Sequence, residues 1–179
     1  HFALLDSNIT HKHTALLVHQ PDDGHAFAQL GWTGVIWGFS GMNDQGLTYS
    51  VVPSDSLDNP FAGQVRTGGW TARLLASGTP IGIKGRELLE RHDTVADAEA
   101  MLRSEGTTFG FNFLLADAQG GLRAVETDAD VEDAPNGGVV SYGPDAADPG
   151  NLDAYGRPLG SVRGDDLRIT TMFTKNVPD

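Results

Sequence analysis

The side chain best suited to chemistry in this sequence is Asn43, within the run Gly41-Met42-Asn43-Asp44-Gln45-Gly46-Leu47. Glycines near both ends of that run, and apolar stretches beyond them, predict a tight turn between two strands with the carboxamide at its tip. A carboxamide carries donors and an acceptor, so a rigid one can hydrogen-bond to a substrate. Asparagine also tolerates turn geometry beside glycine, and this second interpretation stays open.

Other residue types that do chemistry form no complete site. The chain has no cysteine, which removes disulfides, thiolate metal ligands and a cysteine nucleophile from it. His11 and His13 alternate along the chain, with His19 and His25 further on, but no spacing completes a metal site, so surface or pocket-edge positions are expected. The aspartate pairs lack the loop spacing of calcium sites and fit solvated turns. We therefore predict no metal and no cofactor.

The composition is that of a globular domain. A chain of 179 residues can bury roughly 70% of the surface that it exposes when unfolded. The formal charge of −12 argues against binding to nucleic acid or to an anionic membrane surface. No apolar run approaches the roughly 20 residues that span a bilayer. Secreted, periplasmic and cytoplasmic locations all remain open.

Hydrophobic patterning predicts strands, then helices, then strands. Runs rich in β-branched and aromatic residues are expected to form strands at 14–19, 26–30, 35–39, 47–52, 111–116, 122–126 and 139–142. Helices are expected at 70–76, at 84–91, and from Thr94, where Asp97 completes a capping box and Gly106 is a stop signal. The strand at 111–116 is apolar on both faces, so it needs cover on each side.

This order of elements predicts an α+β fold in which two antiparallel sheets stack between helical layers, a four-layer αββα sandwich. Residues 1–179 are expected to be a single domain or part of one. Residues 143–179 are rich in Asp, Pro, Gly and Asn, and are expected to be an irregular C-terminal extension.

Several short blocks follow one another in a fixed order: Gly41–Leu47, Gly78–Pro80 with Arg86–Glu90, Thr94–Ala98, and Asn112–Asp117 with Val125-Glu126. In this order they resemble the penicillin acyltransferase-like and choloylglycine-hydrolase-like branch of the N-terminal-nucleophile hydrolases, over about residues 14–142. The resemblance implies the sandwich described above and an enzyme that cleaves or transfers an acyl group at a linear amide.

In that family the chain cleaves itself, and the new N-terminal residue attacks the amide carbonyl with its own α-amine as base. An α-amine has a pKa of about 7.7 to 8, so it can accept a proton near neutral pH. The family's nucleophile precedes the Asn43 turn by several dozen residues. We therefore expect it upstream of His1, on a second polypeptide or segment of the same precursor.

The resemblance also implies roles for individual residues. Asn43 matches a position that binds the oxyanion of the tetrahedral intermediate, where a fixed donor contributes roughly 3 kcal/mol. A second oxyanion asparagine of the family has no counterpart in Val139-Val140-Ser141-Tyr142-Gly143, so Ser141, Tyr142 or Asn136 would have to replace it. Tyr142 at a strand end is also typical of packing.

Aromatic residues near the turn predict an apolar acyl pocket, with core packing as the alternative. The predicted substrate-binding residues are Trp37, Phe39, Met42, Tyr49 and Phe61. Two other classes of function remain open: a noncatalytic subunit of an assembly, and a β-rich module that binds a small ligand.

Overall fold

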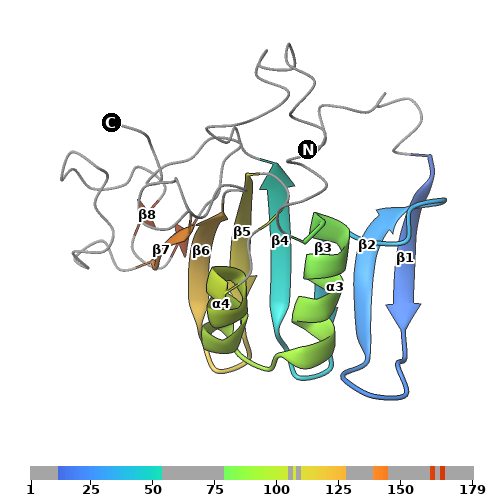
Figure 1. Ribbon diagram of the computed structural model, residues 1–179, viewed down its shortest axis with the longest axis horizontal. Helices are drawn as coiled ribbons and strands as arrows, with labels where there is room; N and C mark the ends of the chain where they lie inside the picture. Colours follow the sequence, from blue (N-terminus) through green and yellow to red (C-terminus); the bar gives the residue numbers. More distant parts are fainter. Residues whose placement is uncertain are drawn as a thin grey trace, which may run out of the picture.

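The computed structural model describes residues 12–53, 79–104, 107, 110–127 and 139–144, together with the main chain of 162–163 and 166–167. The described strands form a seven-stranded antiparallel sheet in which every strand neighbours the next one along the chain (Figure 1). Its members are β1 (Thr14–His19), β2 (Phe27–Trp32), β3 (Ser40–Asn43), β4 (Thr48–Pro53), β5 (Phe111–Ala116), β6 (Leu122–Thr127) and β7 (Val139–Tyr142). Two further short strands, β8 (Val162–Arg163) and β9 (Asp166–Leu167), pair with each other.

Helices α3 (Ile81–Arg91) and α4 (Val95–Ser104) lie between β4 and β5 in sequence and cover one face of the sheet (Figure 1). Their apolar residues recur at helical spacing and are buried, as expected for amphipathic helices. They pack against alternate strand residues to form the main core, which includes Leu47, Tyr49, Val51, Leu88, Leu89, Ala98, Leu102, Phe113, Leu115 and Val125. We call this side of the sheet the helix face.

Helix α4 begins with the predicted pair of Thr94 and Asp97, which forms the Thr94 side-chain cap of a capping box. The main-chain N–H of Asp97 donates to the Thr94 hydroxyl at 3.2 Å, and that hydroxyl donates to the Asp97 carboxylate at 2.7 Å. Asp117, from the β5–β6 turn, adds a second cap because its carboxylate accepts the N–H of Val95 at 2.8 Å. The first turn of α4 is therefore held both by the adjacent Thr94 and Asp97 and by Asp117 of the β5–β6 turn.

The opposite face of the sheet carries no helix among the described residues, and we call it the open face (Figure 1). Because side chains alternate along a strand, the residues between the core positions must point to this face. Leu16, Val18, Leu30 and Met42 do so, and their side chains are 63%, 66%, 53% and 54% exposed. Four large apolar side chains on one sheet face, each more than half exposed, form a contiguous surface of the kind that another layer covers.

The structure confirms an α+β fold, and the sequence placed most strands within a few residues. The predicted strand at 35–39 is wrong: β2 runs on to Trp32, a turn follows, and β3 begins at Ser40. Trp37 contributed to this error because an aromatic residue in such a run is typical of a strand. In the structure Trp37 lies outside the strands, and its ring packs against Gly82 of α3. The expected helix at 70–76 lies outside the described residues, and within the region expected to be irregular β8 and β9 form a hairpin.

No helix among the described residues is both long and apolar enough to cross a bilayer.

Candidate functional site

Asn43 ends β3 on the helix face, and its carboxamide is fully engaged by the main chain. The side-chain nitrogen donates to the carbonyl oxygens of Leu89 at 2.9 Å and His92 at 2.8 Å, at the C-terminal end of α3. The side-chain oxygen accepts the N–H groups of Leu47 at 2.9 Å and Gln45 at 3.2 Å. Asn43 is 5% exposed. The carboxamide thus closes its own turn and caps the carbonyl end of a helix.

This geometry corrects two expectations. The side chain is buried between sheet and helix instead of standing exposed at the tip of the turn. Both amide hydrogens of Asn43 are already donated to helix carbonyls, so the described arrangement leaves none for an oxyanion. The turn chemistry of the Gly41–Leu47 run is accounted for by structure, with Gly46 at φ +89° where a side chain would be strained.

Three chain reversals meet around Asn43. The N–H of His25, in the β1–β2 turn, donates to the carbonyl of Glu90 at 2.9 Å, and the N–H of Asp44 donates to that of Ala26 at 2.9 Å. The imidazole of His25 lies between two carboxylates, with Nε2 at 2.5 Å from Asp93 and Nδ1 at 3.5 Å from Asp44. Main-chain and side-chain bonds between segments distant in sequence therefore hold this end of the sheet together.

Three of the predicted substrate-binding residues also lie on the helix face. Tyr49 donates its hydroxyl hydrogen to the carbonyl of Gly38 at 2.8 Å and accepts a hydrogen bond from Gln29 at 2.7 Å. Burial raises the pKa of Tyr49, and the Gln29 hydrogen bond only partly offsets that effect. Trp37 packs on Gly82, and Phe39 packs against the main core. These aromatic residues have the core-packing role that was the alternative interpretation.

Ser141, predicted as a possible oxyanion donor, instead joins β7 to α4. Its hydroxyl donates to Glu99 at 2.7 Å and accepts a hydrogen bond from Arg103 at 2.8 Å. Burial works against the charged form of Glu99, but hydrogen bonds from Ser141 and Arg103 and the charges of Arg103 and Arg123 outweigh it, so its pKa is lowered. The Ser141 hydroxyl is part of a polar network that ties a helix to the sheet.

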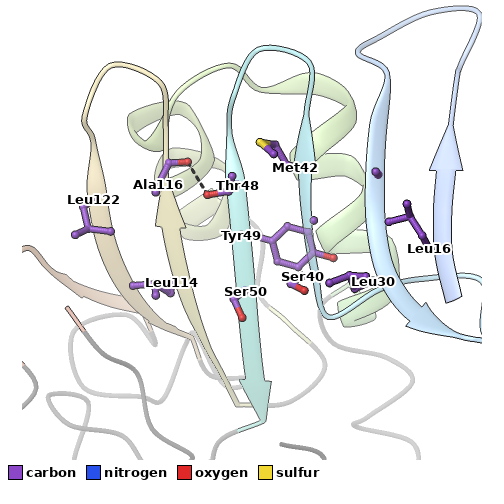
Figure 2. A pocket seen from close by; sticks show the side chains of 12 residues that line it. Leu16, Leu30, Ser40, Met42, Thr48, Tyr49, Ser50, Leu114, Ala116 and Leu122 are labelled. Carbon is purple, nitrogen blue, oxygen red and sulfur yellow. Dashed lines mark hydrogen bonds between the residues drawn. The ribbon is translucent and has the colours of Figure 1, made fainter. Parts of the chain in front are cut away.

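The open face contains a groove of about 500 Å³. Figure 2 shows its lining side chains spread over the strands from β1 to β6, with the helices behind the sheet. Most of the lining is aliphatic, and its hydroxyl-bearing residues are Ser40, Thr48, Ser50 and Tyr49, of which Tyr49 is buried in the main core. The aliphatic side chains that line it are Leu16, Leu30, Met42, Leu114 and Leu122. A groove of this size and lining fits a small apolar group.

Two predicted site residues belong to the open face. Met42 lines the groove, and Tyr49 also borders it although its hydroxyl is bonded to Gly38 and Gln29. Tyr142 is 3% exposed and packs with Ala124, Leu114 and Leu122 beside it. Phe61 and Asn136 lie outside the described residues. The structure therefore does not bring the predicted residues together: Met42 and Tyr142 are separated by the sheet from Asn43 and its neighbours.

Sequence reasoning missed the groove residues as a group. The signal that could have found them was the strand at 111–116 that is apolar on both faces, because side chains alternate along a strand and Leu114 must then face away from Phe113 and Leu115. It also gave no role in chemistry to Glu126, which is fully buried opposite Asn112, itself 1% exposed. Arg123 lies on the other face of β6 and approaches Glu99 at 3.8 Å. Within the described residues no group of three or more His, Asp or Glu side chains is placed to hold a metal ion.

The model of the family described as acyl-coenzyme A:6-aminopenicillanic acid acyl-transferase matches residues 5–134, which is most of the chain, so the protein belongs to this penicillin acyltransferase-like family of the N-terminal-nucleophile hydrolases. A search of the curated proteins found no match.

Among solved structures, penicillin V acylase from Agrobacterium tumefaciens is similar at 20% sequence identity with a TM-score of 0.42. That similarity covers 66% of this chain and 32% of the acylase chain. The chain thus spans about a third of the length of that structure.

Proposed function

We propose that this chain is part of an enzyme that hydrolyses or transfers the acyl group of a linear amide through an acyl-enzyme. The observation that carries this proposal is the family match over residues 5–134. The nucleophile is supplied by polypeptide outside this chain, as an N-terminal Cys, Ser or Thr whose α-amine serves as base. Acyl transfer needs no redox group, and we propose no cofactor.

We propose further that the reacting centre faces the groove on the open side of the sheet. Asn43 is fully engaged on the helix face, whereas the groove offers an apolar surface beside the hydroxyls of Ser40, Thr48 and Ser50. In this arrangement the aliphatic residues hold the acyl group. Tyr142, at the edge of the same face, is the predicted oxyanion donor that stays compatible with this location.

A second sheet over the open face would complete the four-layer sandwich and would enclose the groove. The exposed side chains of Leu16, Val18, Leu30 and Met42 support this arrangement. Covering apolar surface contributes about 25 cal/mol for each Å² removed from water, so a partner layer over these exposed side chains would be stabilising. We propose that the same polypeptide that carries the nucleophile forms this layer.

The test is to produce this chain together with the remainder of its precursor and to assay the assembly with chromogenic acyl amides. Trapping with a slow substrate, followed by intact-mass analysis, should show one acyl group on a chain that begins with Cys, Ser or Thr. Turnover by this chain alone would refute the external nucleophile. Saturable binding of the amide without any turnover by the assembly would instead establish a binding module.

The location is tested with a matched pair of charge substitutions. Leu30→Lys places a charge on the open face, and Ile83→Lys places one on an exposed site of α3, where the isoleucine is 58% exposed. We expect Leu30→Lys to abolish assembly and acyl transfer while Ile83→Lys retains both. Equal activity of the two variants would exclude the open face as the covered and reacting surface.

A further inference from the structure

His19 is the last residue of β1 and lies on the helix face, where its ring stacks on Phe27 of β2. The ring centroids are 4.4 Å apart and the rings are inclined by 15°. The two residues are directly paired across the strands, so the contact is built into the register of the hairpin. Phe27 is 3% exposed and belongs to the main core. The imidazole is thus held against an apolar surface.

The Nε2 atom of His19 is buried and has no hydrogen-bond partner among the described residues. A neutral imidazole can leave one nitrogen as a bare acceptor, but an imidazolium must place an N–H on both nitrogens. A buried N–H without an acceptor is costly, and a buried charge costs more. The site therefore accommodates the neutral ring better than the charged one.

The charged groups that face His19 come from α3. They are Arg86 and Glu90, which form an ion pair with each other at 3.1 Å. Burial is the first cause that lowers the pKa of His19, Arg86 lowers it further, and Glu90 raises it in part. From β2 the facing residue is Phe27, which does not titrate.

Strand β1 pairs with β2 over six residues and with no other described strand. It is the first strand of the sheet, and none of its six residues is fully buried. Leu16, which lines the groove, belongs to this strand. A change at His19 therefore acts on the least buried strand of the sheet and on one wall of the groove.

We propose that His19 is an acid-sensitive contact within the β1–β2 hairpin, beside the Arg86–Glu90 pair of α3, and that its protonation loosens β1 from β2. The sign follows from linkage. A histidine that the folded state holds neutral stabilises the fold fully above the pKa of the unfolded chain, about 6.5, and this contribution is lost as pH falls below it. Each unit of lowering corresponds to a tenfold change in the opening equilibrium at acid pH.

The consequence for the groove rests on the proposed function, whereas the acid response of the hairpin does not. If β1 is one wall of the acyl site, loosening it below neutral pH lowers the affinity for the acyl group. The strand would then act as a pH-responsive side of the site.

The experiment is amide hydrogen exchange on the full chain between about pH 7.5 and 5.5, with rates corrected for intrinsic exchange. Protection of residues 15–19 is expected to fall as pH falls, by more than that of residues 111–116 in the central strand β5. His19→Leu, or His19→Gln if the first variant does not fold, is expected to remove this difference. His13→Gln, an exposed histidine just before the same strand, is the matched control and should retain it.

Arg86→Gln removes the like charge beside His19, so it should reduce the fall in protection. Unchanged protection of residues 15–19 in the wild type, an undiminished fall in His19→Leu, or an equal fall in β5 would each overturn the proposal. The link to acyl transfer is read separately, from the pH dependence of KM in the assembled enzyme. A His19→Leu assembly with an unaltered KM profile would overturn that link and leave the exchange result standing.

Discussion

The side-chain nitrogen of Asn43 lies 2.9 Å from the carbonyl oxygen of Leu89, a residue 46 positions further along the chain. This bond joins the β3–β4 turn to the C-terminal end of α3. The most conspicuous polar residue of the sequence therefore serves to hold a helix against the sheet.

Asn43→Ala is expected to lower the free energy of unfolding by about 2 to 4 kcal/mol, because it leaves buried main-chain donors and acceptors without partners. Chemical denaturation measures this, with Gln45→Ala, at an exposed position of the same turn, as the control. Wild-type stability in Asn43→Ala, combined with loss of acyl transfer in the assembled enzyme, would restore the oxyanion role.

Gly82→Ala is expected to destabilise the protein, although alanine is normally favoured over glycine in a helix by about 0.5 to 1 kcal/mol. A methyl group at this position would overlap the ring of Trp37, and one at Gly85 would overlap the hydroxyl of Tyr49. Overpacking of this kind costs about 1 to 3 kcal/mol. Thermal unfolding should show lower midpoints for Gly82→Ala and for Gly85→Ala. Ile83→Ala, on the exposed side of α3, should stay near the wild type.

Asp117 should make stability depend on acid pH. The N–H of Val95, at the start of α4, is the main cause of its lowered pKa, and the N–H groups of Gly121 and Gln119 add to the effect against a smaller opposing contribution from burial. Because the pKa is lower in the folded state, the carboxylate stabilises the fold above its unfolded pKa, about 3.9. That contribution is lost as pH falls through the folded value.

Asp117→Ala is accordingly expected to cost about 1 kcal/mol at pH 7, the usual value of a lost helix cap, and to flatten the decline in stability below about pH 4. Urea unfolding at several pH values measures both effects. Asp22→Asn, in the exposed β1–β2 turn, is the control and should follow the wild-type curve. A parallel decline in Asp117→Ala would show that the carboxylate does not contribute.

Ser141→Ala is expected to reduce stability by about 1 kcal/mol and to leave acyl transfer unchanged, because the hydroxyl bridges Glu99 and Arg103 on the helix face. Unfolding measurements and steady-state assays of the assembled enzyme separate the two effects. A large fall in kcat with wild-type stability would show that Ser141 acts on the substrate.

Local patterns in the sequence identified most of the elements. Runs of β-branched, aromatic and aliphatic residues placed the strands at 14–19 and 111–116, and a period-3.6 repeat placed the helix that follows Thr94, because burial of an element leaves its pattern in the chain. The capping box of Thr94 and Asp97 could be read directly, since both partners lie within one turn. Trp37 misled the strand assignment because its apolar partner, Gly82, lies far along the sequence.

The candidate site could not be read in this way. Residue types and motif order suggested the family and a polar turn at Asn43, and the match over residues 5–134 agrees with the family. Only the folded chain showed that Asn43, Tyr49 and Ser141 face the helices, and that the groove lies on the opposite side. The sequence by itself determined local conformation and indicated the protein family, because both depend on residues that are near one another in the chain. The face on which a side chain lies depends on strand register and on helices from elsewhere in the chain, so only the tertiary structure decided it.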